Sequence, residues 1–284
     1  MSHESLFQRI AAAITWMVAM GLVALGPGAS PACAGEAAPQ VILNVTFDDK
    51  KMDEDLTGEW RFFAEASSTT VNLTPAQVKR EGAKFLVKDD PTSPGNKVLQ
   101  LAGGDTALPD AWIYVPSLTN TELNKGDYTA VQLDFYAQPG LKKAGRKKID
   151  KRAGPYRIGV LGFIDLDDRA VYGAWMRWSD RQVRAGRMVE GRQEIKRSTK
   201  FGKRKDVNRW YTIRAEFTRQ GDQIEVKGKM WDRMKGEAKA ATSTFTVPLT
   251  AKKTFAIGIF QYTDSDKFGY DKRYIDNIKV IRAK

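Results

Sequence analysis

The residues best suited to ligand chemistry in this sequence are tryptophans that lie close to arginines and lysines. An exposed indole offers a flat apolar face on which a sugar ring can stack, and neighbouring guanidinium or ammonium groups can bind the sugar's carboxylates. The competing interpretation is that a second sheet or a loop covers these rings, as happens to most tryptophans. The sequence predicts a ligand-binding surface from these residues: Trp175, Arg177, Trp178, Arg181, Trp210, Arg214, Lys227, Lys229 and Trp231.

The amino-terminal segment has the pattern of a cleaved export signal. Ile10–Leu25 carries no charge and is shorter than the roughly 20 residues that span a bilayer. Ala32-Cys33-Ala34 supplies the small residues that signal peptidase reads, so cleavage is expected after Ala34. We therefore predict a signal peptide over 1–34, a linker over 35–40 and one domain over 41–284. The expected location is secreted or periplasmic, with no transmembrane span after cleavage.

Cleavage would also remove the chain's single histidine and single cysteine, because His3 and Cys33 both precede the expected site. The mature chain would then lack disulfides, cysteine nucleophiles, Ser-His-Asp triads and histidine metal sites. Any catalysis would depend on carboxylates, tyrosine, lysine or arginine.

Positive charge is concentrated in one central stretch. The chain carries a net charge of +12, and Lys142–Arg209 alone holds 21 basic and 8 acidic residues. The positive electrostatic field of such a stretch raises the local concentration of an anionic partner, so a polysaccharide or another polyanion is the expected partner. The alternative is a generally basic, solvated surface. Nucleic acid is disfavoured because no known binding motif is present and export is expected.

The elements that must position these residues are strands. Apolar and polar residues alternate with period 2 in the segments 131–137, 211–217 and 224–231, and Arg219–Asp222 makes a turn between the last two. Only one helical turn is indicated, near Thr74–Arg80. The sequence therefore predicts an all-β fold, a two-sheet antiparallel sandwich in a single domain. The further segments that we expect to be strands are 41–47, 60–63, 84–87, 98–101, 112–115, 156–164, 170–178, 245–248, 255–262 and 274–281.

Three segments resemble the concanavalin A-like jelly-roll superfamily of lectins, laminin-G-like modules and glucanases. They are the Trp-Tyr hairpin Arg209–Trp231, the run Phe255–Phe260 with Tyr274–Val280, and the opening Asn44–Asp49. The resemblance implies that the first strand pairs with the last. It also implies a structural calcium ion between those strands, held by Asp48, Asp49 and Asp276, although strand-end capping explains the same carboxylates. No cofactor is otherwise required.

The resemblance leaves catalysis undecided, and the sequence leans against it. The Glu-x-Asp-x-x-Glu strand of the glucanases is absent; Ile164–Asp168 is the nearest segment and contains no glutamate. We therefore predict an exported, non-catalytic, glycan-binding jelly roll that favours acidic polysaccharide. One alternative is a lyase or glycoside hydrolase of the same fold, with a tyrosine as the base of a lyase. Another is a structural cell-envelope protein with a basic docking surface. The tyrosines available to a lyase are Tyr136, Tyr156, Tyr172 and Tyr262.

Overall fold

The computed structural model describes most of the chain beyond the predicted signal peptide. The described residues are 39–56, 61–66, 69–73, 84–102, 111–114, 129–137, 157–165, 170–178, 180–189, 192–203, 206–249, 256–262 and 272–282. One compact unit covers Ala38–Lys284. The expected signal peptide, its cleavage site, the helical turn near Thr74–Arg80 and the basic run 142–148 lie outside the described residues.

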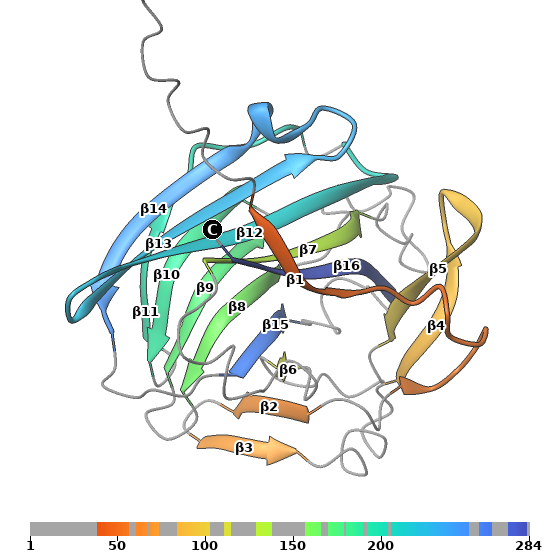
Figure 1. Cartoon of the computed structure of the whole chain (residues 1–284), viewed down its shortest axis with the longest axis horizontal. Helices are drawn as coiled ribbons and strands as arrows, with labels where there is room; N and C mark the ends of the chain where they lie inside the picture. Colours follow the sequence, from red (N-terminus) through yellow and green to blue (C-terminus); the bar gives the residue numbers. More distant parts are fainter. Residues whose placement is uncertain are drawn as a thin grey trace, which may run out of the picture. The chain divides into compact units, whose positions relative to one another are not determined.

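Sixteen strands in the described part of the chain form two antiparallel sheets, which confirms the predicted fold class (Figure 1). Sheet A has the strand order β14-β13-β12-β7-β16-β5-β4, with β1 also paired to β16. Sheet B has the order β11-β10-β9-β8-β15-β6-β2-β3. The strands are β1 (Gln40–Val45), β2 (Arg61–Ala66), β3 (Thr69–Leu73), β4 (Lys84–Asp90), β5 (Ser93–Ala102), β6 (Ala111–Tyr114), β7 (Ala130–Ala137), β8 (Arg157–Asp165), β9 (Ala170–Arg177), β10 (Gln182–Val189), β11 (Arg192–Arg197), β12 (Arg209–Gln220), β13 (Gln223–Asp232), β14 (Ala241–Pro248), β15 (Ala256–Tyr262) and β16 (Lys272–Arg282).

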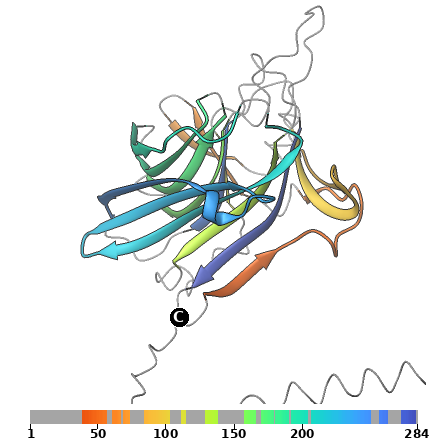
Figure 2. The ribbon, with the colours of Figure 1, turned by 90° about the horizontal axis from the view of Figure 1, so that it is seen from above.

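The pairing of the first strand with the last follows the expectation from the sequence. β1 runs antiparallel to β16, with Val45 opposite Ile278 and Asn44 opposite Lys279, and Figure 2 shows the two strands side by side. The turn after β1 therefore lies next to β16. This pairing brings residues near 48 and 276 together, although most of the chain separates them in sequence.

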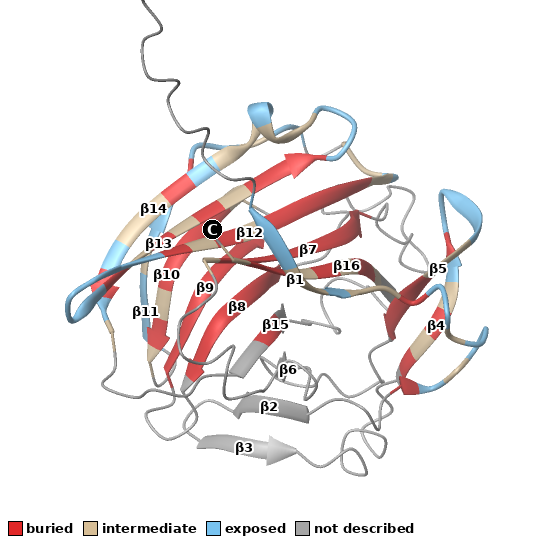
Figure 3. Cartoon of the chain, in the orientation of Figure 1, coloured by how far each residue is buried: buried red, intermediate tan, exposed pale blue. Residues whose placement is uncertain are grey.

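The main core lies between the two sheets. Alternate residues of β7, β12 and β13 pack there against β8, β9 and β10, and these strands are buried along most of their length (Figure 3). Gly228 marks a close approach of the sheets, because a Cβ atom there would lie 2.9 Å from Ala174 Cβ and 3.1 Å from Val183 Cγ1. Each large apolar side chain buried in this way stabilises the fold by about 1.5–3 kcal/mol.

The sequence did not predict three of the strands, β3, β10 and β11. β11 reads Arg-Gln-Glu-Ile-Lys-Arg and is exposed along most of its length, so it shows almost no apolar alternation. Its place in the sheet follows from its backbone pairing with β10, where Arg197 lies opposite Arg184 and Arg192 opposite Val189. Such an edge strand has no second neighbour to bury its side chains.

Candidate functional site

The face of sheet A that points away from the core carries three cross-strand rows of aromatic and polar side chains. Period-2 alternation puts them there, because their neighbours on β7, β12, β13 and β16 point into the core. Most of these side chains are buried. From β5 or β16 toward β13 the rows are Gln100, Tyr274, Tyr136 and Trp210; then Asp276, Asp134, Thr212 and Trp231; then Lys279, Gln132, Arg214 and Lys229.

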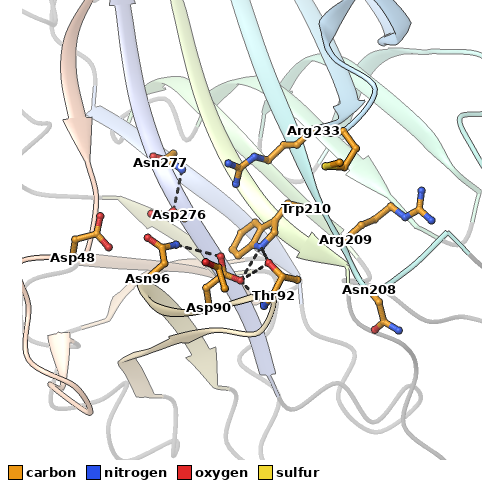
Figure 4. A pocket seen from close by; sticks show the side chains of 12 residues that line it. Asp48, Asp90, Thr92, Asn96, Asn208, Arg209, Trp210, Arg233, Asp276 and Asn277 are labelled. Carbon is orange, nitrogen blue, oxygen red and sulfur yellow. Dashed lines mark hydrogen bonds between the residues drawn. The ribbon is translucent and has the colours of Figure 1, made fainter. Parts of the chain in front are cut away.

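A pocket of about 590 Å³ opens beside the first two rows, and Trp210 and Asp276 are the members of these rows that line it (Figure 4). Its walls come from the turn after β1, the β4–β5 hairpin, the start of β12, the turn after β13 and the bulge of β16. The site is therefore assembled from five segments that are distant in sequence. The lining residues are Asp48, Asp90, Thr92, Ser93, Asn96, Asn208, Arg209, Trp210, Arg233, Met234, Asp276 and Asn277.

Trp210 is held at the base of this pocket by contacts on several sides. Its Nε1 donates to Asp90 Oδ1 at 3.0 Å and to Thr92 Oγ1 at 3.1 Å. The Tyr136 ring lies 5.7 Å from it, and the Arg233 guanidinium carbon lies 5.8 Å from its ring centroid. With only 7% of its surface exposed, the ring is a fixed and largely covered wall of the pocket.

Asp90 organises the hairpin that carries it. Its Oδ1 accepts hydrogen bonds from the backbone N–H and the hydroxyl of Thr92, both at 2.7 Å, and its Oδ2 accepts one from Asn96 Nδ2 at 3.2 Å. Burial disfavours ionisation, but these bonds and the one from Trp210 outweigh it, so the pKa of Asp90 lies below its ordinary value. Asp90 is therefore an ionised anchor between the β4–β5 hairpin and sheet A.

A second pair of carboxylates lies on neighbouring strands beside the pocket. Asn277 Nδ2 donates to Asp134 Oδ2 at 3.1 Å and to Asp276 Oδ2 at 3.0 Å, and Thr212 Oγ1 donates to Asp134 Oδ1 at 2.6 Å. Asn277 has a φ of 50°, in the left-handed region that asparagine tolerates, where the pairing of β16 with β7 shifts register. The bulge thus places one amide between two carboxylates.

Both of these carboxyl groups are harder to ionise than usual. Burial raises the pKa of Asp134. Burial first, and then the negative charges of Asp134 and Asp48, raise the pKa of Asp276 to about 6. The Oδ1 atom of Asp276 is buried and has no hydrogen-bond partner among the described residues. Asp276 therefore has one buried carboxylate oxygen that no described group satisfies.

The chain was compared with protein-family models, with curated proteins and with solved structures. The sequence matches no protein-family model and no curated protein. Solved structures similar to it are concanavalin A-like jelly rolls. A carbohydrate-binding module, CBM66 from Bacillus subtilis, is 14% identical with a TM-score of 0.37, covering 68% of this chain and 89% of its own.

Two further structures extend over more of the chain. The catalytic domain of a glycoside hydrolase family 131 protein from Coprinopsis cinerea is 8% identical with a TM-score of 0.39, covering 85% of this chain and 94% of its own. Lectin I from Ulex europaeus, solved with a methyl glycoside of α-L-fucose, is 10% identical with a TM-score of 0.40, covering 84% and 97%. At these identities the likeness concerns the fold alone, and the chain's own side chains must carry any statement about function.

The structure brings only one of the nine predicted ligand-binding residues, Trp210, into the pocket. Trp175 and Trp178 are fully buried, so neither can stack on a ligand, and the prediction for them is wrong. Trp178 packs in the main core against Phe201 and Tyr211. Trp175 belongs to a second apolar cluster with Leu161 and Met188. Apolar residues on both faces of β9 explain this outcome.

The predicted cations of β12 and β13 are neutralised by glutamates of the same surface. Lys229 Nζ lies 2.6 Å from Glu216 Oε1 and 2.9 Å from Glu237 Oε1, and Arg214 Nη1 lies 3.0 Å from Glu237 Oε2. Lys227 lies 3.8 Å from Glu216. A short 3-10 helix after β13 (Glu237–Lys239), which the sequence did not predict, places Glu237 beside these cations. These cations do not form the free basic surface that was predicted.

The remaining predicted residues also lie outside the pocket. Trp231 follows the expected alternation onto the outer face, but it is only 8% exposed, and the Arg214 guanidinium lies 5.1 Å above its ring. Arg181 occupies the turn between β9 and β10, where its guanidinium donates to the Gly202 carbonyl. Arg177 ends β9 and its carbonyl accepts the Arg181 N–H. Of the tyrosines considered for a lyase, Tyr172 is fully buried in the core and cannot reach a substrate.

The three carboxylates expected to hold calcium are only partly brought together. Asp48 and Asp276 line the same pocket, whereas Asp49 is exposed and does not. The Lys97 ammonium already binds the carbonyl oxygens of Asp48 and Lys50, and its backbone N–H donates to Asp48 Oδ1. Within the described ranges no group of three or more acidic, histidine or cysteine side chains is arranged to hold a metal ion. These residues do not fit the calcium site that the resemblance implied.

In the part of the chain that the structure describes, no helix is long and apolar enough to cross a bilayer.

Proposed function

We propose that this protein is an exported, non-catalytic, glycan-binding jelly roll, and that the glycan occupies the pocket on the outer face of sheet A. The observation that carries this proposal is a roomy pocket in which an indole wall stands beside fixed hydrogen-bonding side chains. Sugars are bound by apolar surface for the ring and by placed donors and acceptors for the hydroxyl groups. Asp276, Asn277 and Asn208 supply such groups here.

The pocket rim carries an exposed apolar side chain that supports this proposal. Met234 is 90% exposed, yet it stands on a well-held turn: Asp232 Oδ1 accepts the Met234 N–H at 3.0 Å, and the Asp232 carbonyl accepts the N–H of Lys235 and of Gly236. A flexible thioether on a fixed turn at a pocket mouth is suited to contact a ligand.

Replacing Met234 with alanine should weaken binding of the glycan by about three- to tenfold and leave stability within ~0.5 kcal/mol of wild type, because an exposed side chain contributes little to folding. The measurement is affinity electrophoresis of the secreted chain against a panel of neutral, amino and acidic polysaccharides. Met52→Ala is the matched control, since Met52 is also exposed, at 41%, but does not line the pocket. Equal retention of both variants would contradict binding at this pocket. No retention on any polymer would contradict glycan binding altogether.

The preference for acidic polysaccharide that the sequence suggested has support in one region, β11 and the segment after it. Arg192, Lys196, Arg197 and Lys200 are exposed there, and none forms an ion pair with another described residue. Like charges on an edge strand also discourage edge-to-edge pairing, so their presence has a second physical reason.

The triple variant Arg192→Gln, Lys196→Gln, Arg197→Gln should lose most of the retention on acidic polymer that wild type shows at low salt. Its retention on a neutral polymer should be unchanged, because the changes do not touch the pocket. For the wild-type protein, the difference in retention between the acidic and the neutral polymer should decrease as salt rises from 20 to 300 mM, since exposed charges are screened. Unchanged retention of the triple variant on acidic polymer would remove the basis for an acidic preference. Binding of acidic polymer with no contribution from the pocket would favour a structural, docking protein instead.

One observation favours glycoside hydrolysis as a second candidate function. A carboxyl group with a pKa near 6, as for Asp276, is partly protonated close to neutral pH, as a general acid must be. Release of reducing ends from any polymer of the panel, abolished in Asp276→Asn, would establish hydrolysis. Retention without release of reducing ends supports the binding function.

A further inference from the structure

More acidic than basic side chains line the pocket, whereas the chain as a whole carries a net positive charge. Asp48, Asp90 and Asp276 line it, and Asp134 lies directly behind, bridged to Asp276 by Asn277. Of its two cations, Arg209 is already bound to Asp232, with Nη1 2.8 Å from Oδ2. The hydrogen bonds from Thr92, Asn96 and Trp210 already satisfy the carboxylate of Asp90. The carboxylates of Asp48, Asp134 and Asp276 remain. Asp48 Oδ1 accepts the Lys97 N–H, and two cations act on Asp134, Arg233 and Lys279. Of these two cations, Arg233 is the one that lines the pocket.

Asp276 is the carboxyl group of this cluster that is only half satisfied, because Asn277 Nδ2 donates to its Oδ2 alone. It is 5% exposed, and its Oδ1 is buried without a hydrogen-bond partner in the described ranges. The charged groups around it are Asp134 from β7, Asp48 from the turn after β1 and Arg233 from the turn after β13. Two negative neighbours outweigh one positive neighbour. A buried carboxylate in such surroundings requires a further cation or donor to be well satisfied.

Arg233 contacts the cluster only weakly. Its Nη1 lies 3.5 Å from Asp134 Oδ2, longer than a good charge-assisted hydrogen bond, and its guanidinium carbon is 5.8 Å from the Trp210 centroid. The side chain is 42% exposed. Figure 4 shows it reaching over the indole toward Asp276. A side chain held by two long contacts and open to water can be displaced at small cost.

We propose that the pocket recognises an amino sugar, and that Arg233 occupies the amino sugar's place until the ligand binds. This inference rests on the proposed glycan-binding function and names the class of sugar. Arg233 makes the two contacts that a bound amino sugar would make: its positive charge lies near the carboxylates, and its flat guanidinium group lies over Trp210. The ligand's ammonium group pairs with Asp276 and Asp134, and the apolar face of its ring covers the indole. Rotation of the Asp276 carboxyl about its soft terminal torsion turns Oδ1 toward the ammonium group.

The test compares two ligands with the same sugar backbone, one with a free 2-amino group that can carry charge and one with that group acetylated and neutral. The chain, without its predicted signal peptide, is titrated calorimetrically at pH 6.5 with a tetramer of β-1,4-linked glucosamine and with the N-acetylated tetramer. We expect the amino tetramer to bind at least about tenfold more tightly, because the N-acetyl group carries no charge to pair with the carboxylates.

The variants distinguish this arrangement from general attraction. Asp276→Asn should weaken the amino tetramer at least about tenfold, and Arg233→Ala should tighten it by about threefold or more, because the competing cation is gone. Arg219→Ala is the control for removing a positive charge, since Arg219 is exposed at the far end of β12 and should leave both affinities unchanged. Thermal unfolding of each variant confirms that it is folded.

The outcomes separate the two proposals. Equal binding of both tetramers, sensitive to Met234→Ala, would keep glycan binding and overturn the amino-sugar inference. Weaker binding by Arg233→Ala would overturn the role of Arg233 as a displaceable cation. Binding of Ca²⁺ alone, lost in Asp276→Asn, would overturn the inference in favour of a metal site. Absence of binding by every glycan tested, acidic polymers included, would overturn the proposed function as well.

Discussion

Asp276→Asn should be more stable than the wild-type protein at neutral pH. The folded protein holds the carboxyl of Asp276 at a pKa of about 6, against an ordinary value of 3.8, because the group is buried beside Asp134 and Asp48. Each unit of pKa difference corresponds to 1.36 kcal/mol, so the ionised carboxylate destabilises the fold by about 2–3 kcal/mol at pH 7.5. Asparagine has nearly the same shape and removes the charge.

The pH dependence of this effect has a definite sign. Between the unfolded pKa and the folded pKa, the folded protein binds more protons than the unfolded chain, so wild-type stability from this group falls as pH rises from about 4 to 6. The variant lacks this decline. Urea unfolding should therefore give Asp276→Asn a larger free energy of unfolding than wild type at pH 7.5. This difference should disappear near pH 4.

Asp49→Asn is the matched control, because Asp49 is an exposed carboxylate near the same turn and should change stability little at either pH. A variant that is less stable than wild type at pH 7.5 would show that Asp276 has a stabilising partner when ionised. A variant that is more stable than wild type at pH 7.5 would instead show that Asp276 lowers the stability of the fold. Residues that lower stability are common at binding sites.

The sequence predicted the framework of the fold because period-2 alternation survives wherever one face of a strand is buried. β7, β12 and β13 show it clearly, and the same alternation put Trp210 and Trp231 on the face away from the core. β11 escaped prediction because it is an edge strand covered by charged side chains. β10 escaped because Arg184, Gly186 and Arg187 interrupt its apolar alternation, and its backbone pairing with β9 and β11 reveals it.

The pocket could not be assembled from the sequence in the same way. Asp90 and Asn96 sit in the β4–β5 hairpin, and Asn208, Arg233 and Met234 sit in turns. The neighbours of these segments depend on how distant strands pair. The nearest signal was the pairing of the first strand with the last, which did bring Asp48 to Asp276. Proximity in sequence was misleading for charge: Arg214 and Lys229 are close to tryptophans along the chain, but the glutamates that neutralise them are closer in space.

Asp90→Ala should have the opposite effect to Asp276→Asn, although both side chains line one pocket. The Asp90 carboxylate accepts four hydrogen bonds, from the Thr92 backbone and hydroxyl, Asn96 and Trp210. Its removal leaves the buried indole N–H with Thr92 alone and should cost about 2–3 kcal/mol at pH 7. Asp90→Asn keeps one acceptor oxygen and should lose roughly half as much.

The pH dependence separates Asp90 from a residue that merely fills space. Because its folded pKa lies below the unfolded value, its contribution is present in full above about pH 4 and disappears as pH falls through the folded pKa. The gap in unfolding free energy between wild type and Asp90→Ala should therefore narrow in acid, where the gap for Asp276 also vanishes. Asp89 is an exposed neighbour on the same strand, so Asp89→Ala should have the same free energy of unfolding as wild type both at pH 7 and in acid. A gap for Asp90→Ala that stayed constant down to pH 2 would mean that packing alone explains the loss, and that Trp210 is not positioned by an ionised carboxylate.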